Sequence, residues 1–274
     1  MTVKWIVAPY AFDGRIGGNI HEVAMSMGYD VDICDFIESL KRYTPPNDYE
    51  DRPVILYGSI PFVRRNHHRY CPGAFGLAET SVSKYMSQVP SDWFLNGDGV
   101  LITYGMLKDR FRKLQDMLGA KRLFVRPESG FKPFTGFVID DDNFAIECLT
   151  LEQVCHVQPD DMLFVATAKD IGEEYRYVII DGQVVASSDY NWNDFDDIKG
   201  ITDPVCDAMA KLVAGHGWQP DIAYTVDVTL YRGEPKIVEY NSFSCSGFYG
   251  CNLRDIVYHA SLAAEKVFRE TFDI

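Results

Sequence analysis

The segment Tyr224–Ser242 constrains the fold of this chain more than any other. Apolar and polar residues alternate along it on both sides of a break at Arg232-Gly233-Glu234. Alternation of this kind on either side of a short glycine-containing break predicts a β-hairpin. We therefore expect two adjacent antiparallel strands near the C-terminal end of the sequence, with Gly233 at the apex.

Three oxygen-bearing side chains share one face of this hairpin. With Gly233 at the apex, Asp227 lies opposite Glu239, and Asn241 lies opposite Thr225. Side chains two residues apart on a strand point to the same face, so Glu239 and Asn241 project together with Asp227 beside them. Two carboxylates and an amide are hard oxygen ligands of the kind that Mg²⁺ prefers. The alternative is a face that points at solvent, which the apolar neighbours of these residues disfavour.

The charge balance argues against two classes of function. The chain has 274 residues and a formal net charge of −14 at pH 7, whereas binding to nucleic acid or to a membrane surface requires a basic footprint. One basic run, Arg64-Arg65-Asn66-His67-His68-Arg69, is the exception. A solvated loop is the simpler interpretation of this run, and reception of an anionic substrate is the alternative.

No stretch approaches the ~20 apolar residues of a membrane span. The apolar run from Met1 to Pro9 is too short for a signal peptide and predicts a buried strand. The seven cysteines contain no Cys-x-x-Cys pair, so neither a zinc ribbon nor a redox dithiol is indicated. We therefore expect reduced thiols and a cytoplasmic protein, in the host cytoplasm if the chain is viral.

The first part of the chain is typical of an α/β domain. A helix over residues 19–27, closed by Gly28, separates two strands at 3–8 and 29–36, and a third strand follows at 52–60. The sequence Gly14-Arg-Ile-Gly-Gly-Asn resembles a phosphate loop only loosely.

The pattern changes after residue 118. An amphipathic helix over 103–118 ends at Gly119, with an apolar stripe of Met106, Phe111, Leu114 and Leu118. Hairpins follow at 121–140, 174–189 and 224–242, with helices at 202–216 and 252–271. We therefore predict an N-terminal α/β domain over 1–118 and an α+β domain over 119–274.

The loop between the first pair of these strands carries phosphate-binding features. Arg126 and Lys132 bracket a stretch rich in Gly, Pro and Ser, in which Gly130 and Gly136 allow a close approach of the backbone to a ligand. Backbone N–H groups together with a lysine form a phosphate cradle. A plain hairpin loop with two solvated cations is the alternative.

Two further segments allow a binding role. Arg176 shares a strand face with Glu174 and aliphatic residues, so it either pairs with a carboxylate or points at an anion. The apolar stretch from Asp161 to Ile171 is either a strand that presents its backbone to an adenine edge or only a core strand.

Taken in order, these motifs resemble the ATP-grasp superfamily over roughly residues 54 to 255. The segment Arg126–Gly136, Glu174-Tyr-Arg with its Asp181-Gly182 hairpin, and Glu239-x-Asn241 resemble the branch named for two arginines and one lysine, found in bacteria and their viruses. A Tyr57-Gly-Ser strand fits the same branch. The resemblance implies two α+β subdomains that hold ATP, preceded by the α/β domain.

The resemblance also implies residue roles. Arg126, Lys132 and Arg176 would be catalytic, while Asp227, Glu239 and Asn241 would hold Mg²⁺, with Glu239 bridging two ions. Nucleotide contacts would come from Ser129, Gly130, Lys132, Val165, Ala166, Glu174 and Arg176. The loop 242–250, or another lid, would exclude water from a hydrolysable intermediate.

The implied activity is an ATP- and Mg²⁺-dependent ligase that joins a carboxylate to an amine, or to a thiol, through an acyl phosphate with release of ADP. Its substrates would be small molecules or peptides, and nucleic acid is disfavoured. A nucleotide-binding or interaction protein without ligase activity, and a phosphotransferase, are the alternatives.

Overall fold

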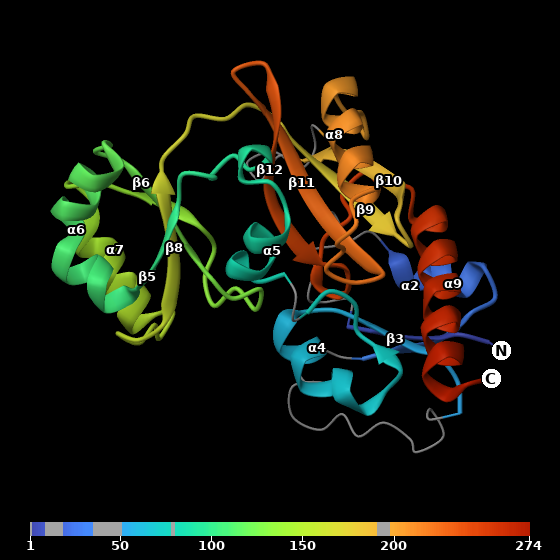
Figure 1. Ribbon diagram of the computed structural model, residues 1–274. Coiled ribbons are helices and arrows are strands. Elements are labelled where there is room, and N and C mark those ends of the chain that lie inside the picture. Colours follow the sequence, from blue (N-terminus) through green and yellow to red (C-terminus); the bar gives the residue numbers. More distant parts are fainter. Residues whose placement is uncertain (1, 9–18, 35–50, 78–79, 191–197) are drawn as a thin grey trace. The chain divides into compact units, whose positions relative to one another are not determined.

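The computed structural model describes residues 2–8, 19–34, 51–77, 80–190 and 198–274 (Figure 1). The glycine-rich stretch 14–18 lies outside them. The chain divides into two units, residues 1–77 with 172–274 and residues 78–171. None of the helices in the described ranges is long and apolar enough to cross a bilayer.

The first unit begins with a parallel sheet in the order β2-β1-β3-β4. This arrangement follows from the predicted strand–helix–strand pattern, because parallel neighbours need a crossover connection. The elements are β1 (Lys4–Val7), α2 (Ile20–Ser26), β2 (Asp30–Ile33), β3 (Val54–Tyr57), α4 (Ile60–Asn66), the 3-10 helix η3 (His67–Arg69) and β4 (Pro72–Gly73).

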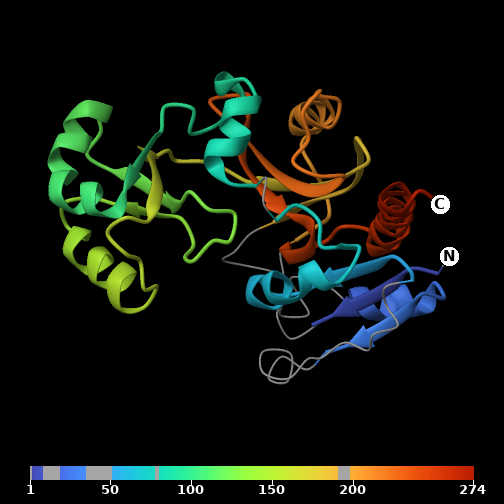
Figure 2. The same cartoon turned by 60° about the horizontal axis from the view of Figure 1, so that its bottom comes forward.

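The rest of the first unit is an antiparallel sheet in the order β10-β9-β11-β12. Helix α8 contacts all four strands from one side, and α9 contacts β9 and β10 from the other, as Figures 1 and 2 show. The elements are β9 (Glu174–Ile180), β10 (Gln183–Tyr190), α8 (Pro204–Ala214), β11 (Ala223–Tyr231), β12 (Glu234–Ser242), the 3-10 helix η6 (Phe243–Cys245) and α9 (Leu253–Phe272).

One hydrophobic core joins the two sheets of this unit. It brings together Trp5 of β1, Tyr57 of β3, Val178 of β9 and Val257 of α9. The indole Nε1 of Trp5 donates a hydrogen bond to Ser261 Oγ at 3.1 Å. The segments before residue 77 and after residue 172 therefore build a single folded body.

The second unit is an antiparallel sheet, β5-β8-β6-β7, with α6 and α7 on one face (Figure 1). Its elements are α5 (Val82–Gln88), the 3-10 helix η4 (Ser91–Trp93), β5 (Val100–Thr103), α6 (Tyr104–Leu118), β6 (Leu123–Pro127), β7 (Phe137–Ile139), α7 (Phe144–Gln153) and β8 (Met162–Thr167).

The predicted domain boundary at residue 118 does not match this division. Strand β5 pairs with β8, and Phe111 of α6 stacks on Phe144 of α7 with ring centroids 4.3 Å apart. Residue 118 therefore lies inside one core. The change in sequence pattern there marks a passage from helix to strands within one unit.

Helix α6 ends as predicted, but its buried stripe differs by one position. Thr103 Oγ1 accepts a hydrogen bond from Met106 N, and Gly119 closes the helix at φ +67°. Leu107 is fully buried, whereas Met106 is 47% exposed. Leu107, Phe111, Leu114 and Leu118 follow the four-, three- and four-residue spacing of one helix face, whereas Met106 lies five residues before Phe111, so the predicted stripe began at the wrong neighbour.

The Tyr224–Ser242 hairpin forms, and both predicted pairs are confirmed: Asp227 opposite Glu239, and Thr225 opposite Asn241. The turn is tighter than predicted, because Tyr231 pairs with Glu234 around a two-residue turn in which Arg232 and Gly233 both have positive φ. A bulge after Asp227 in the pairing restores the predicted register.

Candidate functional site

The candidate site occupies one face of the β10-β9-β11-β12 sheet. The register aligns Arg176 on β9 with Asp227 on β11, and Asp227 with Glu239 on β12. Further along the same face, Val178 and Ile180 belong to the core that α9 covers. The face therefore has an apolar part under the helix and a polar part beyond it.

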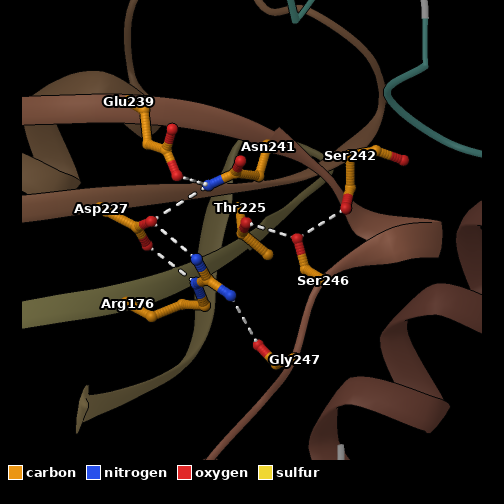
Figure 3. Close-up of polar contacts among 8 residues, drawn as sticks. All are labelled: Arg176, Thr225, Asp227, Glu239, Asn241, Ser242, Ser246 and Gly247. Atoms are coloured by element: carbon orange, nitrogen blue, oxygen red, sulfur yellow. Dashed lines mark hydrogen bonds and ion pairs between the residues drawn. The ribbon is translucent and has the colours of Figure 1, made fainter. Parts of the chain in front are cut away.

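Arg176 and Asp227 form a buried, two-pronged ion pair (Figure 3). Arg176 Nε donates to Asp227 Oδ1 at 2.8 Å, and Nη2 donates to Oδ2 at 2.7 Å. Asp227 is 0% exposed and Arg176 6% exposed. Charges buried to this extent require each other, because an isolated one would lose its hydration without compensation. Of the two alternatives for Arg176, the structure therefore shows the one in which it pairs with a carboxylate.

Asn241 links the two carboxylates. Its Nδ2 donates to Asp227 Oδ2 at 3.0 Å and to Glu239 Oε1 at 2.9 Å (Figure 3). Two carboxylates and one amide thus meet in a small volume, and Glu239 remains half-buried at its edge. This donor set fits a hard divalent cation. No group of three or more His, Cys, Asp or Glu side chains suited to a metal occurs among the described residues.

The segment after β12 packs against this site. Gly247 O accepts from Arg176 Nη1 at 3.0 Å, and the Tyr249 ring centroid lies 5.1 Å from Arg176 Cζ. Burial raises the pKa of Tyr249 to about 12, with Arg176 acting in the opposite direction. Beside these residues, Thr225 Oγ1 lies 2.9 Å from Ser246 Oγ (Figure 3).

This packing argues against the lid predicted for residues 242–250. Apart from Cys245 and Gly250, these residues are buried, and Ser242 Oγ donates to Phe75 O at 2.7 Å. The Phe248 ring stacks on Tyr57. The segment is therefore a fixed wall of the first unit. Gly247 and Tyr249 lie within the predicted lid, but their contacts with Arg176 were not predicted.

The predicted phosphate loop belongs to the second unit. Arg126 lies on β6 and is 5% exposed. Lys132 N donates to Ser129 O at 3.1 Å, and Lys132 takes a left-handed conformation at φ +38°. Ser129 Oγ accepts from Phe131 N at 3.2 Å. The loop is thus a series of tight turns.

The glycines of this loop serve close packing. A Cβ on Gly130 would come 3.1 Å from the carbonyl carbon of Thr80 and still closer to its hydroxyl. A Cβ on Gly136 would strike the ring of Phe124. Gly136 therefore permits packing over β6, which differs from the predicted approach to a ligand.

The adenine contact predicted for Val165 and Ala166 is disfavoured. Strand β8 lies between β5 and β6, and both residues are 0% exposed. Val165 pairs with Val100 of β5 and with Val125 of β6, and Ala166 pairs with Phe124 of β6, which matches the core-strand alternative. Polar contacts begin where the strand ends: Lys169 Nζ lies 2.6 Å from Asp98 Oδ1, and Thr167 N donates to Asp98 Oδ2.

The remaining predicted residues lie in the first unit. Glu174 begins β9, half-buried, two residues from Arg176 on the same face. The basic run forms the end of α4 and the 3-10 helix η3, so it is helical where a loop was the simpler prediction. Burial raises the pKa values of the Cys245 and Cys251 thiols to about 12, which makes them inert packing residues at neutral pH.

The family follows from comparison with known proteins. The family model that matches residues 58–260 is described as an ATP-grasp domain, family 3 of the R-2-K clade. The chain belongs to this ATP-grasp family. The match includes the whole second unit and the three site-bearing strands β9, β11 and β12. No curated protein matches the sequence significantly.

Solved structures agree with the ATP-grasp assignment. D-cycloserine synthetase DcsG aligns with a TM-score of 0.66 at 14% identity, over 97% of this chain and 99% of that one. D-alanine–D-alanine ligase from Bacillus anthracis, complexed with ATP, gives 0.58 at 16% over 99% and 100%. The ATP-grasp ligase PsnB with a minimal precursor gives 0.55 at 11% over 96% and 99%. At these identities the likeness establishes the fold.

Proposed function

We propose that this ATP-grasp protein is an ATP- and Mg²⁺-dependent ligase that joins a carboxylate to an amine or a thiol. The observation that carries the proposal is the convergence of Arg176, Asp227, Glu239 and Asn241 on one sheet face. A guanidinium beside two carboxylates and an amide can serve both a metal ion and the phosphoryl oxygens bound to it.

In the proposed reaction, a substrate carboxylate oxygen attacks the γ-phosphorus of ATP, and the bond from that phosphorus to the ADP oxygen breaks. The amine nitrogen then attacks the acyl carbon of the resulting acyl phosphate, loses a proton, and inorganic phosphate leaves. Both reactants of the first step are anions, so fixed positive charge is the main requirement on the protein.

Asp227, Glu239 and Asn241 would hold the magnesium ions, with Glu239 as the bridge between two of them. Bound Mg²⁺ would neutralise phosphate charge in the transition state. Asp227 has a second task, since its two oxygens orient the Arg176 guanidinium. Asn241 holds the two carboxylates at a fixed separation through its amide nitrogen.

The second unit would supply the remaining phosphate contacts. We assign Lys132, Ser129 and Gly130 to the phosphates and Arg126 to the transferring group, with Glu174 of the first unit as a nucleotide contact. Arg126, Arg176 and Lys132 would then be the two arginines and one lysine of the bacterial and viral branch. The tight turns and packed glycine of the loop support a fixed array of backbone donors.

This assignment predicts a specific effect of Gly130→Ala. The added methyl group meets the Thr80 backbone and hydroxyl, so the loop must shift. We expect Mg·ATP binding, measured by calorimetry, to weaken about tenfold, in line with the usual cost of overpacking. Gly217→Ala is the matched control, because a Cβ there meets nothing within 4 Å. Equal Mg·ATP affinities of the two variants would contradict the assignment of this loop to the nucleotide site.

The substrate class is proposed from the neighbours in fold. D-alanine–D-alanine ligase is named for the joining of two amino acids, and PsnB is described with a precursor peptide. A small-molecule or peptide carboxylate and amine are therefore the first candidates here. A non-ligating nucleotide-binding protein and a phosphotransferase are the alternative functions, and both would use the same ATP-binding residues.

Hydroxylamine trapping separates a ligase from these alternatives. With ATP, Mg²⁺ and the right carboxylate, hydroxylamine should intercept the acyl phosphate as a hydroxamate, with one ADP released per hydroxamate formed. A panel of amino acids and peptides provides the carboxylates. ADP release at one rate with every carboxylate and with none, together with no hydroxamate, would contradict the ligase proposal and favour a simple ATPase or binder.

A further inference from the structure

The guanidinium of Arg176 is supported on its face as well as at its edges. Asp227 and the Gly247 carbonyl bind its nitrogens, and the Tyr249 ring lies over it with 5.1 Å between Cζ and the ring centroid. Tyr249 is only 8% exposed. Hydrogen bonds at the edges of a planar cation fix its position and restrict its orientation, and an aromatic face packed against it adds further resistance to tilting.

The backbone of Tyr249 is unusual for such a large side chain. Its φ is +48°, in the left-handed region that bulky residues rarely adopt. Glycine, which adopts this region without strain, stands next to it at Gly250, where φ is not left-handed. The ring is therefore held in place against a local conformational preference, a kind of outlier that often marks a functional position.

The segment around Tyr249 is anchored on both sides. The preceding ring, Phe248, stacks on Tyr57 at 5.3 Å with 17° between planes. After Tyr249, Gly250 N donates to Ser188 Oγ at 3.1 Å. Ser188 is fully buried and pairs with Arg176 across β10 and β9. The ring position is thus tied to the strand that carries the arginine.

We propose that Tyr249 is a positioning residue that fixes the plane of the Arg176 guanidinium for phosphoryl transfer. The proposal rests on the proposed function for its catalytic consequence, but the positioning itself can be tested without any substrate. The residue acts through Arg176 and need not touch the reacting atoms.

Two substitutions at Tyr249 distinguish the contribution of its aromatic ring from that of its backbone conformation. Tyr249→Phe keeps an aromatic face. Tyr249→Asn removes it and suits a left-handed backbone better than other non-glycine residues, so the segment can keep its path. Tyr231→Asn is the matched control, because Tyr231 carries Arg232 at the same 5.1 Å separation but at the hairpin turn. Thermal unfolding of each variant reports whether the fold is retained.

The first measurement is the mobility of the Arg176 side chain, from ¹⁵N relaxation of its Nε–H group in nucleotide-free protein, with the signal assigned by its loss in Arg176→Lys. We expect Arg176 to be rigid in the unchanged protein, in Tyr249→Phe and in Tyr231→Asn, and mobile in Tyr249→Asn. An Arg176 that stays equally rigid in Tyr249→Asn would overturn the proposal.

The second measurement is steady-state turnover. Tyr249→Asn should lower kcat about tenfold with KM for ATP nearly unchanged, while Tyr249→Phe and Tyr231→Asn should retain kcat. A mobile Arg176 with unchanged kcat would overturn the link to phosphoryl transfer. If the unchanged protein hydrolyses or transfers no phosphate at all, the proposed function fails, and the relaxation data alone decide whether Tyr249 positions Arg176.

Discussion

ATP turnover is expected to fall by at least about 100-fold in Glu239→Gln, while the protein remains folded. The substitution removes one negative charge from the proposed metal site and leaves the side-chain volume nearly unchanged. Glutamine can still accept the hydrogen bond that Asn241 Nδ2 donates to Glu239 Oε1. The substitution should therefore leave the hairpin intact, and a loss of turnover would report the effect of the charge at the bridging position.

Glu234→Gln is the control for this experiment. Glu234 starts the same strand, its side chain is 72% exposed, and it pairs with Lys236 at 3.0 Å near the turn. Turnover by Glu234→Gln should match that of the unchanged protein. Normal Mg·ATP turnover in Glu239→Gln, with thermal unfolding also unchanged, would contradict the metal-ligand assignment.

Asn241→Asp should impair turnover less than Glu239→Gln, because an oxygen ligand remains at the position. The contacts of Asn241 show that this substitution should also lower the stability of the folded protein. Asn241 donates to both Asp227 and Glu239, so an aspartate there removes two hydrogen bonds and places a third negative charge between two others. Accordingly, Mg²⁺ should raise the melting temperature of Asn241→Asp more than that of the unchanged protein.

The second large effect is expected at Arg176. Hydroxamate formation in Arg176→Ala should drop by on the order of 100- to 1,000-fold, whereas Mg·ATP affinity should change much less. The reason is that charge on the transferred phosphoryl group develops during the reaction, and only interactions that strengthen there accelerate it. Trapping yields and calorimetric affinities, measured on the same protein, give the two numbers.

The alanine variant also carries a stability cost that has to be separated from catalysis. Asp227 is fully buried, and removing its partner leaves an uncompensated charge at a cost of about 3–5 kcal/mol. Arg176→Lys keeps a positive charge but not the two-pronged geometry, so it should fold better and still trap poorly. If Arg176→Lys formed hydroxamate as fast as the unchanged protein, the two-pronged geometry of Arg176 would not matter for catalysis. Arg176 would then supply only its charge, or would have no catalytic function.

Local sequence pattern was enough to predict the hairpin face. Asp227 and Glu239 could be placed opposite each other because strand periodicity is two and the turn is short. Even so, the predicted register was correct only because two unpredicted features cancel each other. The turn at Arg232-Gly233 is tighter than predicted, and a bulge in β12 shifts the pairing back. Neither feature has a sequence signal as strong as the alternation itself.

Local sequence pattern does not specify contacts between distant segments, and only the family resemblance placed Arg176 in one site with Asp227. That Arg176 pairs with Asp227 depends on β9 lying beside β11, and periodicity within either strand says nothing about its neighbour. The same holds for Gly247 and Tyr249, whose contacts with Arg176 require the segment after β12 to fold back over the sheet. The domain boundary was misplaced because β5 and α6 share a core with strands that follow them in sequence.

The composition of the first unit from two separated stretches of sequence has a consequence for biosynthesis. Trp5 completes its environment only against Ser261 and the rest of α9, which the ribosome adds about 250 residues later. The second unit, whose core residues lie between Val100 and Val165, can form this core while the nascent chain is still growing. During synthesis the N-terminal strands therefore remain partly uncovered until α9 has been made and packs against them. In this interval the chain most needs protection from aggregation.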